Sequence, residues 1–174
     1  MDTRRLKKTQ KLYHRITLKL IEKEWTVTTM ESCTAGFIAS LLTDTEGSSA
    51  ILKGAYVTYS NTAKVNNGVP ATVITRFGVY SPETAEMMAK ACRESYEADI
   101  GIGITGSFGN PDPNNRDSVI GSVYVSFDVR GKRQSWHLQI PEQPSRFDYK
   151  RVVAEAVGEK LWELLNGADQ KAKR

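Results

Sequence analysis

Hydrophobic residues recur at helical spacing in three stretches of the chain. A basic stretch near the start predicts an amphipathic helix over about residues 5–24, and a later stretch predicts a final helix, with a frayed tail after residue 167. Between them, Ser81 as N-cap and Pro82 at the first helical position predict a helix to about Tyr96. The apolar residues that carry the three patterns are Leu12, Tyr13, Ile16, Leu20 and Ile21; Ala85, Met88, Ala89, Cys92 and Tyr96; and Val153, Val157, Leu161, Leu164 and Leu165.

Short stretches rich in β-branched and apolar residues alternate with these helices and predict strands. Three of them cover residues 25–30, 51–59 and 100–105, and two more, 119–129 and 134–140, flank a turn and predict a hairpin. The apolar run 35–42 predicts a further helix, and residues 61–70 a loop, with a helical turn within it as the alternative. This alternation predicts one domain over residues 1–174, a three-layer α/β/α sandwich with a mixed, mostly parallel sheet, because the hairpin requires an antiparallel pair.

Composition fits this picture, with 40% hydrophobic and 25% charged residues among 174. No apolar run is long enough to span a membrane and none follows the N-terminus, so we expect a cytoplasmic protein without a membrane partner. The formal net charge of +4 arises at the ends of the chain, since residues 20–167 hold 14 basic and 18 acidic residues. The body therefore lacks the basic surface typical of nucleic-acid binding.

Cysteine and histidine are too sparse for a typical metal site or a disulfide framework. The chain has two cysteines, Cys33 and Cys92, and two histidines, His14 and His137, without metal-ligand spacing. We therefore expect no metal and no cofactor. An exposed hairpin and apolar helices make a homo-oligomer plausible.

Ligands of such folds bind at the carboxyl ends of the strands, and Ser32 follows the first strand. At a strand-to-helix turn its hydroxyl would lie near free backbone amides that can stabilise an oxyanion, which is a position for a nucleophile. The alternative is that Ser32 or Thr34 only caps the helix. Cys33 is a rival nucleophile or a small buried residue.

A serine nucleophile needs a base, and neither histidine lies near this edge of the sheet. Lys64 follows the second strand, and partial burial would lower its pKa and let it accept a proton. Tyr59 ends the same strand. The alternatives are a solvated loop lysine for Lys64 and a core or strand-end aromatic residue for Tyr59.

The third strand ends in Thr105, Gly106 and Ser107, whose backbone amides could cradle a phosphate or carboxylate. The signal is weak, because the surrounding glycines match neither a phosphate-binding loop nor a dinucleotide fingerprint. The alternative is that Gly101, Gly103 and Gly106 let a helix pack close to the sheet.

Together, these segments resemble one known family. The residues concerned are Glu31-Ser32-Cys33-Thr34-Ala35-Gly36, Gly47-Ser48-Ser49, Tyr59-Ser60-Asn61, Ala63-Lys64-Val65, Gly68-Val69, Val79, Ser81 and Thr105-Gly106, and in this order they resemble the C-terminal domain of the competence/damage-inducible CinA family over about residues 10–165. The resemblance implies an α/β/α fold and deamidation of nicotinamide mononucleotide (NMN) to nicotinic acid mononucleotide and ammonia.

The resemblance also implies roles for single residues. It makes Ser32 the nucleophile and Lys64 the base, with Tyr59 beside them as a further catalytic residue. It makes Thr34, Thr105, Gly106, Ser107 and Arg146 candidates for binding the substrate. The chain departs from the family pattern at Ala35, where a glycine is usual, and in the loop at 106–115, where Phe108 replaces alanine. The alternative function is therefore an inactive paralogue that acts as a nucleotide-binding or interaction protein.

Overall fold

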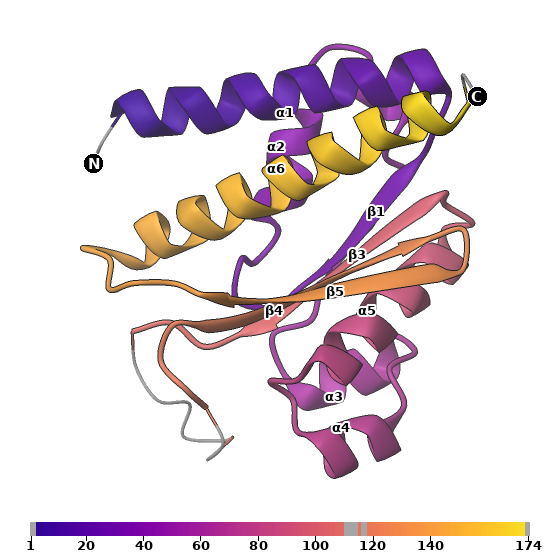
Figure 1. Ribbon diagram of the computed structural model, residues 1–174. Coiled ribbons are helices and arrows are strands. Elements are labelled where there is room, and N and C mark those ends of the chain that lie inside the picture. Colours follow the sequence, from indigo (N-terminus) through magenta and orange to yellow (C-terminus); the bar gives the residue numbers. More distant parts are fainter. Residues whose placement is uncertain (1–2, 110–114, 116–117, 173–174) are drawn as a thin grey trace.

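The protein is a three-layer α/β/α sandwich in the computed structural model, which describes residues 3–109, 115 and 118–172 (Figure 1). Its sheet has five strands in the order β2-β1-β3-β4-β5. They are β1 (Val27–Glu31), β2 (Ala55–Val57), β3 (Ile100–Gly106), β4 (Ser122–Val129) and β5 (Lys132–Gln139). β1 pairs in parallel with β2 and β3, whereas β4 is antiparallel to both β3 and β5. Among these strands β4 alone is reversed, which confirms the predicted mixed, mostly parallel sheet.

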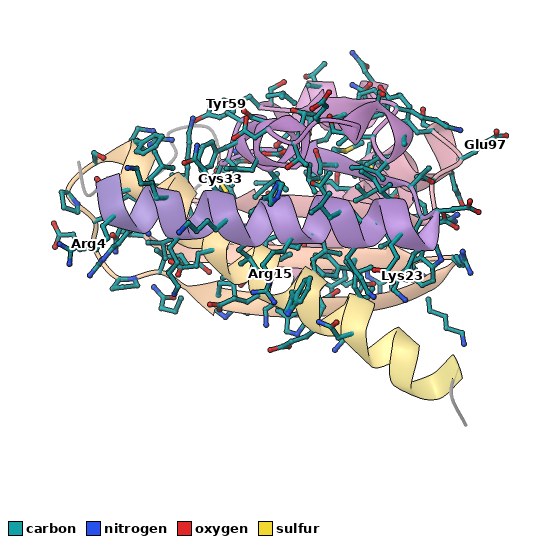
Figure 2. The ribbon with its side chains drawn as sticks, turned by 90° about the horizontal axis from the view of Figure 1, so that it is seen from above. Arg4, Arg15, Lys23, Cys33, Tyr59 and Glu97 are labelled. Atoms are coloured by element: carbon teal, nitrogen blue, oxygen red, sulfur yellow. The ribbon has the colours of Figure 1, made fainter. Side chains whose placement is uncertain are left out.

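Helices cover both faces of the sheet (Figure 1). One face carries α1 (Thr3–Lys23), α2 (Phe37–Thr43) and α6 (Arg146–Ala172), and the other carries α3 (Asn61–Asn66), α4 (Ala71–Phe77) and α5 (Pro82–Ser95). Seen from above, α1 lies across α6, and the labelled residues Arg4, Arg15 and Lys23 are spread along the length of α1 (Figure 2). The main core lies between the sheet and the α1–α2–α6 layer, where Tyr13, Val27 and Val157 are buried together.

On the face that carries α3, α4 and α5, helix α5 lies closer to the sheet than a side chain on the strand below it would allow. A Cβ atom on Gly101 would lie 2.1 Å from the Ala89 carbonyl oxygen, and one on Gly103 would lie 2.1 Å from that of Ala85. Helix α5 therefore packs directly on the backbone of β3, as the alternative for these glycines predicted.

The structure differs from the prediction around the short helices. The predicted loop over 61–70 contains α3, which Ser60 caps by accepting a hydrogen bond from the Ala63 amide, and α4 follows it without having been predicted. Both helices are too short to show an apolar period. Helix α6 continues to Ala172 rather than fraying after residue 167, because Leu165, the last buried residue among the side chains described, marks the end of the packed face and not of the helix.

Candidate active site

Ser32 and Lys64 meet at the carboxyl edge of the parallel strands. Ser32 directly follows β1, and its amide donates to the Ile104 carbonyl at 3.0 Å, which continues the pairing with β3. The Lys64 Nζ lies 3.2 Å from the Ser32 Oγ and donates to the Thr58 carbonyl at 2.9 Å. The two side chains are 7% and 2% exposed, so the pair lies inside the protein, and Lys64 is not a solvated loop lysine.

Helix α3 explains how a lysine reaches this buried position. Thr58 follows β2, and its amide donates to the Glu31 carbonyl, which holds the end of β2 against β1. Ser60 then caps α3, and the Lys64 amide donates to the Ser60 carbonyl within the first turn. The lysine is therefore fixed at its backbone and at its amine, and a fixed base needs little reorganisation before it reacts.

The chain turns tightly between Ser32 and α2. The Ala35 amide donates to the Ser32 carbonyl at 3.0 Å, and both Ala35 (φ +52°) and Gly36 (φ +85°) are left-handed. Gly36, which has no side chain, is the N-cap residue of α2, so the alternative that Ser32 or Thr34 is the cap is wrong. Thr34 is fully buried, and its Oγ1 has no hydrogen-bond partner within the described part of the chain.

The buried carboxylate of Glu31 accepts hydrogen bonds from the first amides of α2, which were predicted to be free to stabilise an oxyanion at the nucleophile. Glu31 is fully buried and accepts hydrogen bonds from the Ile38 amide at 3.2 Å and the Ala39 amide at 2.9 Å. The Thr29 hydroxyl donates to it as well, at 2.9 Å. No local sequence pattern assigns a role to Glu31, although an acidic residue at the end of a buried strand is an unusual signal. The first amides of α2 are therefore not free to bind an oxyanion.

Cys33 is a buried residue and a poor nucleophile. Its side chain is 4% exposed and belongs to the main core. Burial, together with the charge of Glu31, raises the pKa of the thiol to about 12. The thiolate is the reactive form, so the environment favours Ser32 as the nucleophile.

The candidate phosphate cradle at the end of β3 has few free donors. The Thr105 hydroxyl donates to the Val79 carbonyl at 2.9 Å, and the Ser107 amide donates to the Ser122 carbonyl at 3.0 Å. A Cβ atom on Gly106 would lie 2.6 Å from that same carbonyl, so this glycine serves the close approach of β4. These contacts hold the strand end beside Ser32 but leave neither donor for a phosphate.

Tyr59 and Arg146 form a more exposed group beside this edge. The Arg146 guanidinium donates to the Tyr59 hydroxyl at 2.9 Å and lies 5.5 Å from the centre of the Phe108 ring. Tyr59 is 58% exposed, so it is neither a core residue nor in the buried pair, whereas Phe108 is 2% exposed and stacks on Tyr149. Arg146 also lines a groove of about 650 Å³. The altered loop lies partly outside the described residues, which lack 110–114.

The described residues contain no cluster of three or more histidine, cysteine, aspartate or glutamate side chains suited to a metal ion. Within the same residues, no helix combines the length and the apolar character needed to cross a membrane.

Comparison with solved structures supports the fold. A CinA superfamily protein from Klebsiella pneumoniae superposes with a TM-score of 0.83 at 25% identity, over 91% of this chain and 98% of that one. A competence/damage-inducible protein from Agrobacterium tumefaciens gives a TM-score of 0.82 at 29% identity, over 91% of this chain and 95% of that one.

Comparison with known sequences gives the family. A competence-damage inducible protein of Halothermothrix orenii is 44% identical over 109 residues, which are 62% of this chain and 26% of that protein. A CinA-like protein of Cytophaga hutchinsonii is 35% identical over 116 residues, 66% of this chain and 28% of that protein. The chain thus spans little more than a quarter of the length of either relative. The family model of the CinA C-terminal domain matches residues 9–164, and the chain belongs to this family.

Proposed function

We propose that the protein is an amidohydrolase that deamidates NMN to nicotinic acid mononucleotide and ammonia. One observation carries the proposal: a buried lysine amine lies 3.2 Å from a buried serine hydroxyl at the carboxyl edge of the sheet. Burial away from water disfavours an ammonium ion, and a neutral amine can accept the proton of a serine that it touches. The resemblance of the surrounding motifs to the family supplies the substrate.

The first half of the reaction uses both members of the pair. The Lys64 amine takes the proton of the Ser32 hydroxyl as Oγ attacks the carboxamide carbon. The Thr58 carbonyl accepts one N–H of the amine, at 2.9 Å, and so helps to orient the lone pair toward Ser32. The ammonium form of Lys64 then returns a proton to the leaving nitrogen, and ammonia departs.

The oxyanion needs donors other than the first amides of α2. The Cys33 and Thr34 amides directly follow the nucleophile, and neither donates to a backbone carbonyl among the residues that the structure describes. Both instead lie close enough to the Cys33 thiol to lower its pKa by hydrogen bonding. The amide after the nucleophile is a common oxyanion donor in serine hydrolases, so we assign this role to the two amides. The unpartnered Thr34 hydroxyl, buried in the same turn, is a further candidate for contact with the substrate.

The second half of the reaction releases the acid. Water attacks the acyl group on Ser32 while Lys64 takes the proton of that water. The carbonyl–Oγ bond then breaks as the Lys64 ammonium returns the proton to Oγ, which restores the serine hydroxyl and the neutral amine. We assign the substrate phosphate to Arg146, because its guanidinium lies on the exposed side of the site and carries a charge that suits a phosphate. Tyr59 would orient Arg146. The cytoplasmic location and the homo-oligomer remain predictions from the sequence.

The test is ammonia release from NMN by the purified protein and two neighbouring variants. Ser32→Ala removes the nucleophile and should abolish turnover while the protein stays folded by circular dichroism. Cys33→Ala is the matched control and should remain active. Activity lost in Cys33→Ala but kept in Ser32→Ala would contradict the assignment, and no ammonia from the wild-type protein would favour a nucleotide-binding paralogue.

A further inference from the structure

Glu31 and Ser32 are neighbours that face opposite layers of the sandwich. Side chains alternate along a strand, and Val27, Thr29 and Glu31 share one face of β1. Val27 lies in the core under α1 and α6, and Glu31 reaches the start of α2 on that same side. Ser32 instead meets Lys64, which comes from α3 on the other side. The nucleophile therefore lies at one end of a turn whose other end is bound to Glu31.

The Glu31 side chain ties the strand to α2 across this turn. It accepts hydrogen bonds from two backbone amides and one hydroxyl. The turn that it closes contains Ala35 in a left-handed conformation, which costs an L-residue roughly 1–2 kcal/mol. Strained turns persist only where the surroundings hold them.

We infer that Glu31 is a positioning residue for the nucleophilic turn, an inference that rests on the proposed function. Its carboxylate occupies the Ile38 and Ala39 amides and fixes α2 against the end of β1. The Ser32 hydroxyl and the Cys33 and Thr34 amides are thereby held in one arrangement. The hydrogen bonds of the Glu31 carboxylate run to the Thr29 hydroxyl and to two amides of α2, so Glu31 acts on the nucleophile through the turn.

Glu31→Gln is the direct test, because glutamine keeps the shape but can accept only one of the two amides with its single oxygen. Asp99→Asn is the matched control. The Asp99 carboxylate also accepts a backbone amide and a threonine hydroxyl, both from Thr26, but at the opposite end of β1. Thr29→Val is a gentler variant that removes one hydrogen bond to Glu31 and keeps its carboxylate.

Two readouts separate this inference from the proposed function. The first is kcat and KM for NMN. The second is the rate at which a fluorophosphonate probe modifies Ser32, with loss of fluoride, which needs no NMN activity. We expect Glu31→Gln to lower both kcat and the modification rate about 10- to 100-fold at equal folded fraction, with KM unchanged, because small misplacements of reacting groups have effects of this size. Asp99→Asn should lower the melting temperature only.

The outcomes are decisive in either direction. Wild-type rates in folded Glu31→Gln, or equal losses in Asp99→Asn, would overturn the inference. If Glu31→Gln does not fold, Thr29→Val takes its place, and a fall of about threefold or more in both rates supports the inference, whereas no fall overturns it. A wild-type protein that reacts with the probe but not with NMN would refute NMN as substrate and leave the inference testable by the probe. A wild-type Ser32 that does not react would overturn both.

Discussion

Replacing Lys64 with methionine tests the proposed base directly. Methionine has a similar length and shape but carries no amine, so it removes the group 3.2 Å from the Ser32 hydroxyl without opening a large cavity. Only 2% of the Lys64 side chain is exposed, so water has little access to replace the amine. The perturbation is therefore chemical rather than steric.

The expected loss of activity is large and the expected loss of stability small. General base catalysis contributes roughly 10²–10⁴-fold, so kcat should fall at least about 100-fold, which corresponds to about 2.7 kcal/mol in the barrier. The Thr58 carbonyl loses its hydrogen bond, at a cost of about 1–3 kcal/mol. That cost is opposed by relief from burying a polar amine, which is of similar size. We therefore expect the melting temperature to stay close to that of the wild-type protein.

The assay is ammonia release from NMN at several pH values, with thermal unfolding followed on the same samples. Lys90→Met is the control, because Lys90 lies on α5 and is exposed to solvent. Lys64→Arg adds a second comparison, since arginine keeps the positive charge but cannot accept a proton. A folded Lys64→Met variant whose kcat is within tenfold of the wild-type value would refute the base assignment, and an active Lys64→Arg variant would reduce Lys64 to an electrostatic anchor.

Three further predictions concern the surroundings of this pair. Burial raises the pKa of the Cys33 and Cys92 thiols to about 12, so above pH 9 the unfolded thiols ionise while the folded ones stay protonated. The free energy of unfolding should then fall by about 1 kcal/mol for each cysteine between pH 9 and 10. Denaturant unfolding of the two alanine variants at several pH values should show a smaller decrease of this free energy with pH. Ala35→Gly relieves a left-handed alanine and should raise stability by up to about 1 kcal/mol, whereas Gly36→Ala should lower it by about 1–2 kcal/mol; unfolding shifts of equal sign would contradict the turn geometry. Arg146→Ala should raise KM for NMN more than for uncharged nicotinamide riboside, and equal rises would remove its phosphate role.

The sequence was sufficient to predict the layers of the fold and to bring Ser32 and Lys64 to one edge of the sheet, and the family resemblance then paired them. Apolar periodicity identified the long helices, and β-branched runs identified the strands. The rule that parallel strands present their carboxyl ends at one edge then brought two distant segments together, and the structure places their side chains 3.2 Å apart. The prediction succeeded here because it depended on strand direction and not on atomic detail.

The role of Glu31 and the occupied donors at Thr105 and Ser107 could not be predicted in the same way. Glu31 reaches amides seven and eight residues further along only because the turn holds two consecutive left-handed residues. The Ser107 amide donates to the Ser122 carbonyl because the pairing of the chain with β4 continues beyond the end of β3. The sequence does not reveal this register. Both features depend on tertiary contacts that local patterns do not encode.

Alternation along the strand explains why the serine, and not the adjacent cysteine, meets a base. The side chains of Glu31 and Cys33 belong to the layer of α1, α2 and α6, where Cys33 is buried among apolar residues and its pKa is raised to about 12. Ser32 lies between them in the chain and faces the opposite layer, from which Lys64 approaches. A shift of one residue in the register of β1 would exchange these environments and place the thiol beside the amine. The pairing of Glu31 with both Val57 and Ile104 fixes that register, so the hydrogen bonds of the sheet determine which side chain can act as the nucleophile.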